Sequence, residues 1–313
     1  AIADHDAAAQ ERARLRAPHA RLLSADALIE HGDVDAVLIA TPTDTHADIA
    51  ARVATAGKHM YLEKPIAASA QQAEVMRQSV QRSGVHAVVG FNRRHHPIYR
   101  RAKAAIRDRM IGRVYAVHSV FAEPAPATSM PLWKRARATG GGVLLDLASH
   151  HVDSVRWLLD QDVATVSAQV ESRASEHDIA SITLSLRDGT LVQGHYSFRS
   201  ALADTIELHG ELGVLRLDRH RQTVTLTAPR RLGYGTRTTI LSPFDMTWQD
   251  RLRQVVRPSQ DPSYAAAWRA FVDLMEGRPS AVATIDDGMA SLAVVLAAES
   301  AVLAGVSVRL AHV

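Results

Sequence analysis

The sequence predicts a Rossmann-type α/β domain with a parallel sheet, followed by an α+β domain with a large, mostly antiparallel open sheet. Two observations predict this order. Strands alternate with helices up to about Gly90, and after Arg113 apolar and polar positions alternate between turn signals. A chain of 313 residues is long enough for two domains of ordinary size, which we place at residues 1–92 and 93–313.

The first part of the chain repeats strand, helix and short connection. Residues 34–40 form an almost continuous aliphatic run, which is typical of a strand buried on both faces. The expected strands cover 34–40, 59–62 and 85–90, and the expected helices cover 45–56 and 69–81. Short connections between such elements imply right-handed crossovers and therefore a parallel sheet.

The second part has the alternation of an antiparallel sheet with one covered face. Its expected strands cover 114–121, 163–171, 178–186, 190–198, 204–209, 213–217 and 223–227, and its expected helices cover 143–159, 263–276 and 287–303. A large open sheet exposes an apolar face unless a partner covers it, so we expect a homo-oligomer, either a dimer or a tetramer.

The composition excludes several classes of protein. A hydrophobic content of 47% with 22% charged residues is that of a soluble globular chain, and no apolar run reaches the length of a membrane span. The net charge of +3 comes without a basic stripe interleaved with aromatic residues, so neither a nucleic acid nor a membrane is an expected partner. The absence of cysteine excludes thiolate chemistry and fits a cytoplasmic location.

One lysine stands out, because the chain contains four lysines among its 36 basic residues. Lys64 comes directly after a predicted parallel strand, at the sheet edge where ligands collect. An ammonium group there can lose its proton, as an acid or base catalyst must, whereas a guanidinium group in practice cannot. Pro65 restricts Lys64 to an extended conformation. The alternative is an exposed loop lysine paired with Glu63, which is the common situation for lysine.

A second group of polar residues lies on the helix that follows the glycine run Gly140–Gly142. Asp146 and His150 are four residues apart, so both should project from one helix face, where the carboxylate can orient the imidazole. The alternative is a solvated Asp/His pair. We interpret His151 as structural. Neither of the two His-His pairs has the spacing of metal ligands, so no metal site is expected.

These segments together resemble the Gfo/Idh/MocA family of nicotinamide-dependent oxidoreductases. The resemblance covers almost the whole chain and rests on five segments in the right order. They are "DVDAVLIATPTDTHADIAARVATAGKHMYLEKP", "VVGFNRRHHPIYRRAK", "GGGVLLDLASHHVDSVRWLL", "IELHGELGVLRLD" and the C-terminal stretch that begins "YAAAWRAFVDLMEG".

The resemblance implies hydride transfer between NAD(H) and a carbinol carbon of a sugar, inositol or related polyol. It implies that Lys64 is the catalytic lysine and that Asp146 and His150 complete the catalytic set, with Lys64 or His150 exchanging the hydroxyl proton. It also implies a cis Lys64–Pro65 bond. Further cofactor residues implied in this way are Thr41, Pro42, His46, Glu63 and Asn92, with Lys64 itself beside them, while Arg94 and Trp133 are implied as substrate-pocket residues.

The sequence departs from the family pattern in two places. Ala148 stands where glycine is usual, and the start of the chain has no Gly-x-Gly-x-x-Gly phosphate loop. Asp4 resembles the acid that binds the adenosine ribose, which favours NAD over NADP. Because the glycine loop is missing, we expect that this chain is a fragment, or that the start of its gene was assigned too late. The alternatives to a polyol dehydrogenase are a non-catalytic sensor or scaffold of the same fold, and an NAD-dependent glycoside-cleaving relative.

Overall fold

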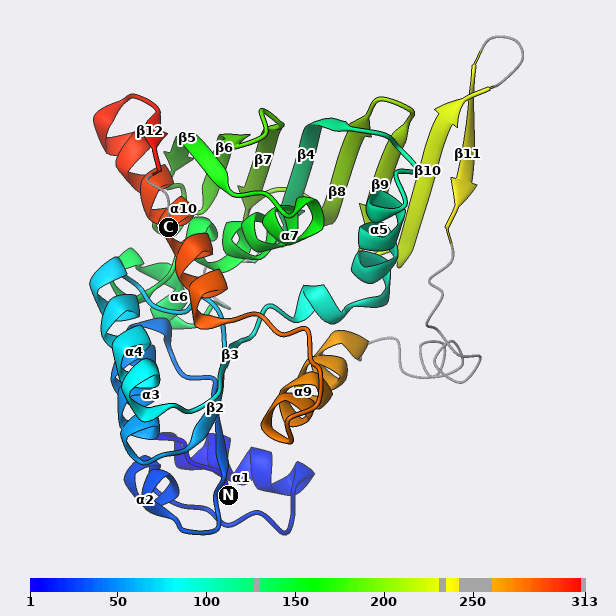
Figure 1. The fold of residues 1–313 in the computed structure, drawn as a ribbon. Coiled ribbons are helices and arrows are strands. Elements are labelled where there is room, and N and C mark those ends of the chain that lie inside the picture. Colours follow the sequence, from blue (N-terminus) through cyan, green and yellow to red (C-terminus); the bar gives the residue numbers. More distant parts are fainter. Residues whose placement is uncertain (126–129, 231–234, 242–260, 311–313) are drawn as a thin grey trace.

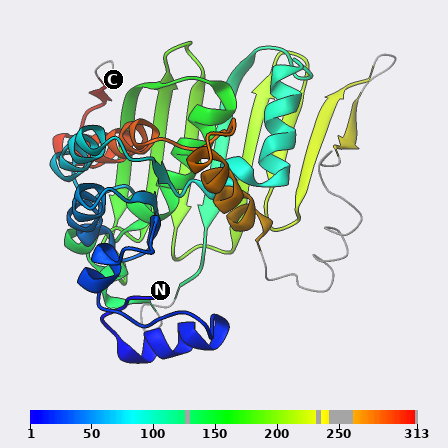
Figure 2. The same cartoon turned by 60° about the horizontal axis from the view of Figure 1, so that its bottom comes forward.

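The computed structural model describes residues 1–125, 130–230, 235–241 and 261–310 (Figure 1). A three-stranded parallel sheet lies at the end of the molecule that holds the N-terminus, and a nine-stranded sheet forms the other end. Figure 2 shows helices gathered on one side of the large sheet. The predicted order, a Rossmann-type sheet followed by a large open sheet, is confirmed.

The parallel sheet has the strand order β1-β2-β3, as expected for strands joined by helical crossovers. Its elements are β1 (Ala36–Ile39), the 3-10 turn η1 (Thr43–Thr45), α3 (His46–Thr55), β2 (His59–Leu62), α4 (Ala70–Ser83) and β3 (Ala87–Val89). Ser69 begins α4 by accepting a hydrogen bond from the Gln72 N–H. Gly84 ends this helix with φ at 66°, a left-handed conformation that glycine adopts easily.

The N-terminal residues lie beside this sheet. Two helices, α1 (Ala7–Arg16) and α2 (Ala25–Glu30), follow one another. Ile2 pairs with Leu22 through a single parallel bridge, which is not part of the β1-β2-β3 sheet. Asp4 follows this bridge, and it is exposed.

The large sheet has the order β11-β10-β9-β8-β4-β7-β6-β5-β12. Its strands are β4 (Val114–Ala122), β5 (Val163–Glu171), β6 (Ile179–Leu186), β7 (Leu191–Ser197), β8 (Ala203–Gly210), β9 (Val214–Asp218), β10 (Thr223–Pro229), β11 (Thr236–Ile240) and β12 (Val308–Arg309). Among the described strands of this large sheet, only β4 and β7 are parallel neighbours. The expectation of a mostly antiparallel sheet is therefore confirmed.

Helices cover one face of the large sheet. They are α5 (Pro97–Arg107), α7 (Ser149–Leu159) and α10 (Ile285–Ala304). The apolar half of each of the strands β4 to β10 faces them, and the opposite positions are mainly polar. Examples of these opposite positions are His118, Ser181, Thr183, Gln193, Thr205, Glu207 and Arg216. The expectation of an apolar open face is wrong for most of the sheet, because the alternation that produces one apolar face leaves mainly polar residues on the other. Tyr115 and Leu191 are among the exposed apolar exceptions.

Two C-terminal helices return toward the parallel sheet. Helix α9 (Pro262–Met275) packs Ala267 and Phe271 against Tyr61 of β2 and Val88 of β3. Helix α10 contacts β5, α7, α4 and β3. By length and composition alone α10 could cross a membrane, but much of its apolar surface is buried in the protein core. The chain passes between the sheets at the 3-10 turn η2 (Asn92–His95), and the domain boundary at residue 92 stays a prediction.

Candidate active site

Lys64 lies directly after β2 and reaches a carboxylate of the second part of the chain. Its Nζ donates hydrogen bonds to Asp146 Oδ1, at 2.9 Å, and to the Asp146 carbonyl oxygen, at 2.8 Å. The Lys64 side chain is only 12% exposed, so the alternative of an exposed loop lysine paired with Glu63 is wrong. The Lys64–Pro65 peptide bond is cis, as the resemblance implied.

A second lysine, which the sequence analysis missed, shares this carboxylate. Lys134 lies on the short helix α6 (Leu132–Arg135), and its Nζ donates to Asp146 Oδ2 at 2.8 Å. Burial alone would raise the pKa of Asp146, but the ammonium groups of Lys64 and Lys134 outweigh it and hold that pKa below its usual range. Asp146 is therefore a carboxylate that holds two cations. The signal in the sequence was again the rarity of lysine.

His150 does not have the partner that the sequence analysis assigned to it. Among the described contacts Asp146 binds the two lysines, and the buried His150 Nδ1 has no hydrogen-bond partner. Asp146 lies in a π-helical segment, η4 (Leu144–Ala148), which precedes α7. The expectation that Asp146 orients His150 is wrong.

The electrostatic surroundings keep His150 neutral. Burial lowers the pKa of His150 well below its ordinary value, and the positive charge of Lys64 lowers it further. A neutral ring with a free nitrogen can accept a hydrogen bond from a hydroxyl group.

His46, a predicted cofactor residue, is buried under the turns that follow β1 and β2. It is 1% exposed, with Nδ1 2.9 Å from the Pro65 carbonyl oxygen and Nε2 2.9 Å from the Thr41 carbonyl oxygen. Burial lowers its pKa. His46 therefore joins the turn after β1 to the turn that carries Lys64. Thr41 is exposed, and Pro42 beside it is half-buried.

Glu63 and Asn92 follow the other two parallel strands. Burial raises the pKa of Glu63, and the nearby Lys64 opposes this effect in part. Asn92 is 2% exposed, and its Nδ2 donates to Ser263 Oγ of α9 at 2.9 Å. Asn92 thus connects the end of β3 to α9.

The two substrate-pocket candidates have different surroundings. Arg94 is buried and binds Asp153 through two guanidinium nitrogens and Asp287 through one. The expectation that Arg94 lines the pocket is wrong, because internal carboxylates occupy its guanidinium group. Trp133 is half-buried, and Lys134 Nζ lies 5.4 Å from its ring centroid, so Trp133 is next to the Asp146 centre.

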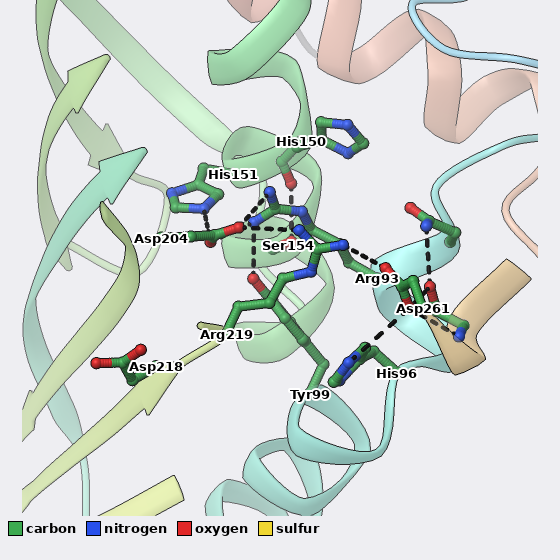
Figure 3. Close-up of polar contacts among 12 residues, drawn as sticks. Arg93, His96, Tyr99, His150, His151, Ser154, Asp204, Asp218, Arg219 and Asp261 are labelled. Atoms are coloured by element: carbon green, nitrogen blue, oxygen red, sulfur yellow. Dashed lines mark hydrogen bonds and ion pairs between the residues drawn. The ribbon is translucent and has the colours of Figure 1, made fainter. Parts of the chain in front are cut away.

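His151 belongs to a buried polar network that supports the helix of His150 (Figure 3). Its Nε2 lies 3.0 Å from Asp204 Oδ1, and its Nδ1 lies 2.6 Å from Ser119 Oγ. Asp204 also accepts two hydrogen bonds of 2.8 Å from Arg93. This network joins α7 to β4, β8 and η2, so the interpretation of His151 as structural is confirmed.

The carboxyl ends of the three parallel strands fit the nicotinamide end of a dinucleotide. They lead into Thr41 and Pro42, into Glu63 and Lys64, and into Asn92, at the edge where such sheets bind ligands. A Gly-x-Gly-x-x-Gly loop is not present in the sequence, so no described residue is assigned to the cofactor phosphates. Within the described part of the chain, no group of three or more His, Cys, Asp or Glu residues is placed to hold a metal ion.

Two family models match consecutive parts of this chain. A family model described as an oxidoreductase family with an NAD-binding Rossmann fold matches residues 1–91, so the class is that of the NAD-binding oxidoreductases. A second model, described as the GFO/IDH/MocA C-terminal domain, matches residues 99–216. The chain belongs to the GFO/IDH/MocA family, as the sequence predicted.

Relatives and solved structures agree with this assignment. The inositol 2-dehydrogenase of Rhizobium meliloti (strain 1021) is 30% identical over 282 residues, which are 87% of this chain and 80% of that protein. The 1,5-anhydro-D-fructose reductase of Ensifer adhaerens is 30% identical over 296 residues, which are 90% of this chain and 81% of that protein. An oxidoreductase domain protein from Kribbella flavida has the same fold, with a TM-score of 0.84 at 22% identity over 99% of this chain and 89% of that one. Levoglucosan dehydrogenase in complex with NADH and levoglucosan has a TM-score of 0.85 at 21% identity, covering 99% of this chain and 90% of that one.

Proposed function

We propose that this NAD-dependent oxidoreductase acts on a carbinol carbon of a sugar, inositol or related polyol, with Lys64, Asp146 and His150 as its catalytic residues. The observation that carries the proposal is the position of Lys64. Its ammonium group extends past the end of a parallel strand and is held by a buried carboxylate. The names of the inositol and sugar relatives support the class of substrate.

Proton transfer and hydride transfer have separate carriers in this proposal. Bound NAD supplies the hydride acceptor at the carboxyl edge of the parallel sheet. As the hydride leaves the carbinol carbon, the hydroxyl proton passes to Lys64 Nζ, which takes part as the neutral amine, and the carbinol becomes a carbonyl. Asp146 holds Lys64 in place. The neutral ring of His150 accepts a hydrogen bond from a neighbouring hydroxyl group of the polyol. Reduction runs through the same groups in reverse.

The cofactor contacts that we propose come from four places. Thr41, Pro42, Glu63 and Asn92 border the nicotinamide end, and His46 supports Thr41 through its contact with the Thr41 carbonyl oxygen. Asp4 is proposed to bind the adenosine ribose, since it follows the Ile2 bridge and is exposed. A carboxylate repels a 2′-phosphate, so NAD is preferred to NADP.

The test is the Lys64→Ala variant, assayed with NAD and NADP across a panel of inositols, sugars and anhydrosugars. We expect kcat to fall by roughly 10²- to 10⁴-fold, because the proton carrier is lost. NADH binding, followed by fluorescence, should change little. The matched control is Lys103→Ala, since Lys103 binds carbonyl oxygens and Asp160 at the far end of α7. Unchanged turnover in Lys64→Ala would refute the role of Lys64.

The alternative is a sensor or scaffold of the same fold without a working cofactor site. The coding sequence upstream of Ala1 separates the two candidates. An in-frame glycine fingerprint there supports the enzyme, whereas a stop codon followed directly by a start codon supports the scaffold. Cleavage of glycosides in the same panel would identify the glycoside-cleaving alternative.

We further propose a cytoplasmic homo-oligomer. The cysteine-free composition supports the location. Tyr115 and Leu191, each 53% exposed at the starts of the adjacent strands β4 and β7, support self-association through the open sheet. Light scattering on the purified protein measures the mass and tests this proposal, which a monomeric mass would contradict.

A further inference from the structure

We propose that Lys134 is a positioning residue that sets the protonation of Lys64, because both lysines share the carboxylate of Asp146. This inference deepens the proposed function, since it rests on Lys64 as the proton carrier. It assigns a role to a residue outside the predicted set of Lys64, Asp146 and His150.

The geometry that carries the proposal is a carboxylate with one ammonium group on each oxygen. Lys64 Nζ is 2.9 Å from Oδ1, and Lys134 Nζ is 2.8 Å from Oδ2. The exposed fraction is 15% for the Asp146 side chain, 12% for Lys64 and 32% for Lys134. Within the described part of the chain, Asp146 is the only hydrogen-bond acceptor of Lys134 Nζ.

The charges explain what the second lysine does. A carboxylate paired with Lys64 alone would stabilise the protonated ammonium and so oppose release of its proton. Lys134 takes up part of that negative charge, and its own positive charge disfavours a second cation close by. Both effects act in the same direction. Lys134 therefore makes it easier for Lys64 to exist as the neutral amine that accepts a hydroxyl proton.

The backbone fixes Lys134 relative to Asp146. Thr139 Oγ1 donates to the Trp133 carbonyl oxygen at 2.7 Å, and the Glu176 N–H donates to the Arg135 carbonyl oxygen at 3.1 Å. The Lys134 carbonyl group packs directly on Gly141, where an added Cβ would lie 2.4 Å from its oxygen. This glycine belongs to the run that opens the helix of Asp146, so α6 and Asp146 are parts of one packed unit.

The direct test is the titration of Lys64 by NMR, which requires no turnover. A protein labelled with ¹³C in lysine gives four side-chain signals, because the sequence has only four lysines, and Lys64→Arg identifies the signal of Lys64. In Lys134→Met we expect the midpoint of the Lys64 titration to move to higher pH by about one unit, the size expected of one nearby charge. Lys134→Arg should restore the wild-type midpoint, and Lys103→Met is the matched control.

Lys134→Gln separates charge from geometry, because glutamine can still donate to Asp146 but carries no charge. We expect the same upward movement in Lys134→Gln as in Lys134→Met, and this variant also carries the test if the Met variant does not fold. A Lys64 midpoint that stays at its wild-type value in the neutral variants overturns the proposal.

Kinetics provide a second readout. In the polyol oxidation assay, the acidic limb of the pH profile of kcat/KM should move to higher pH in Lys134→Met and stay in place in Lys103→Met. A lower kcat with an unmoved limb would mean a merely structural role and would overturn the inference. Failure of the proposed function itself would be recognised by a different result, which is normal turnover in Lys64→Ala.

Discussion

Rare lysines carry much of the information at the scale of single residues. Lys64 could be predicted from the sequence, since it stands alone after a buried strand in a chain that otherwise uses arginine. Lys134 is equally rare, but its role depends on where α6 packs, and no local pattern specifies that position. Arg94 was predicted wrongly for the same reason. Its partners Asp153 and Asp287 are distant in sequence, so only the tertiary structure reveals the internal ion pairs.

The charge balance at Asp146 gives a prediction for stability. Asp146→Asn removes the negative charge from between two largely buried ammonium groups, so we expect the free energy of unfolding to fall by about 2 kcal/mol. Urea denaturation at pH 7 measures this, and turnover should be lost as well. The control is Asp33→Asn, since Asp33 is 83% exposed and its described ion pairs, with Arg21 and His31, lie at the surface. Equal stability losses in the two variants would contradict the account.

At the scale of elements, hydrophobic periodicity predicted most helices and strands to within a few residues. Helix α4 and strand β5 were expected from Ser69 and from residues 163–171, and both begin where expected. The π-helical segment η4 was not predictable, because its residues have the pattern of an ordinary α-helix. It carries Asp146, which binds Lys64 and Lys134 instead of His150, and π-helical turns are frequent at functional sites.

The glycine run before this helix gives a prediction at the same scale. In Gly141→Ala the new Cβ would lie 2.4 Å from the Lys134 carbonyl oxygen, so α6 must move away. We expect a loss of about 1–3 kcal/mol in stability and a reduced kcat, because Lys134 leaves Asp146. The matched control is Gly32→Ala, since an added Cβ there meets no atom within 4 Å. A crystal structure of Gly141→Ala in which Lys134 still binds Asp146 would contradict the prediction that α6 moves.

At the scale of the whole molecule, the order of the two sheets could be predicted, but the contacts between them could not. The return of α9 to Tyr61 and Val88 joins segments about 200 residues apart in sequence, and apolar periodicity predicts a helix without predicting its partner. The buried network of Arg93, His151 and Asp204 is likewise invisible to local patterns, since its members come from three elements.

Buried histidines between the sheets predict how stability depends on pH. Burial lowers the pKa of His96 to about 4, below the ordinary value near 6.5 that applies in the unfolded chain. Between these two values the unfolded state binds more protons, so the free energy of unfolding falls as the pH falls. Between pH 7 and 4.5 this loss amounts to about 2 kcal/mol for His96.

The variant that tests this dependence is His96→Asn. His96 Nδ1 accepts a hydrogen bond from the Ile98 N–H at the start of α5, and an asparagine side chain can keep that cap without titrating. Urea denaturation across this pH range should therefore give a flatter profile than in the wild type. His5, which is 92% exposed, provides the control variant His5→Asn, with the wild-type profile expected. A wild-type slope in His96→Asn would contradict the prediction.

The central claim, direct hydride transfer between a carbinol carbon and NAD at the Lys64 centre, is tested most directly by isotope transfer. The protein is incubated with NAD and with inositols and sugars that carry deuterium on their carbinol carbons, and the reduced cofactor is analysed by mass spectrometry. We predict NADH that contains deuterium from the substrate, formed by the wild-type protein and not by Lys64→Ala. Reduced cofactor without deuterium, or equal deuterium transfer by both proteins, would contradict the account.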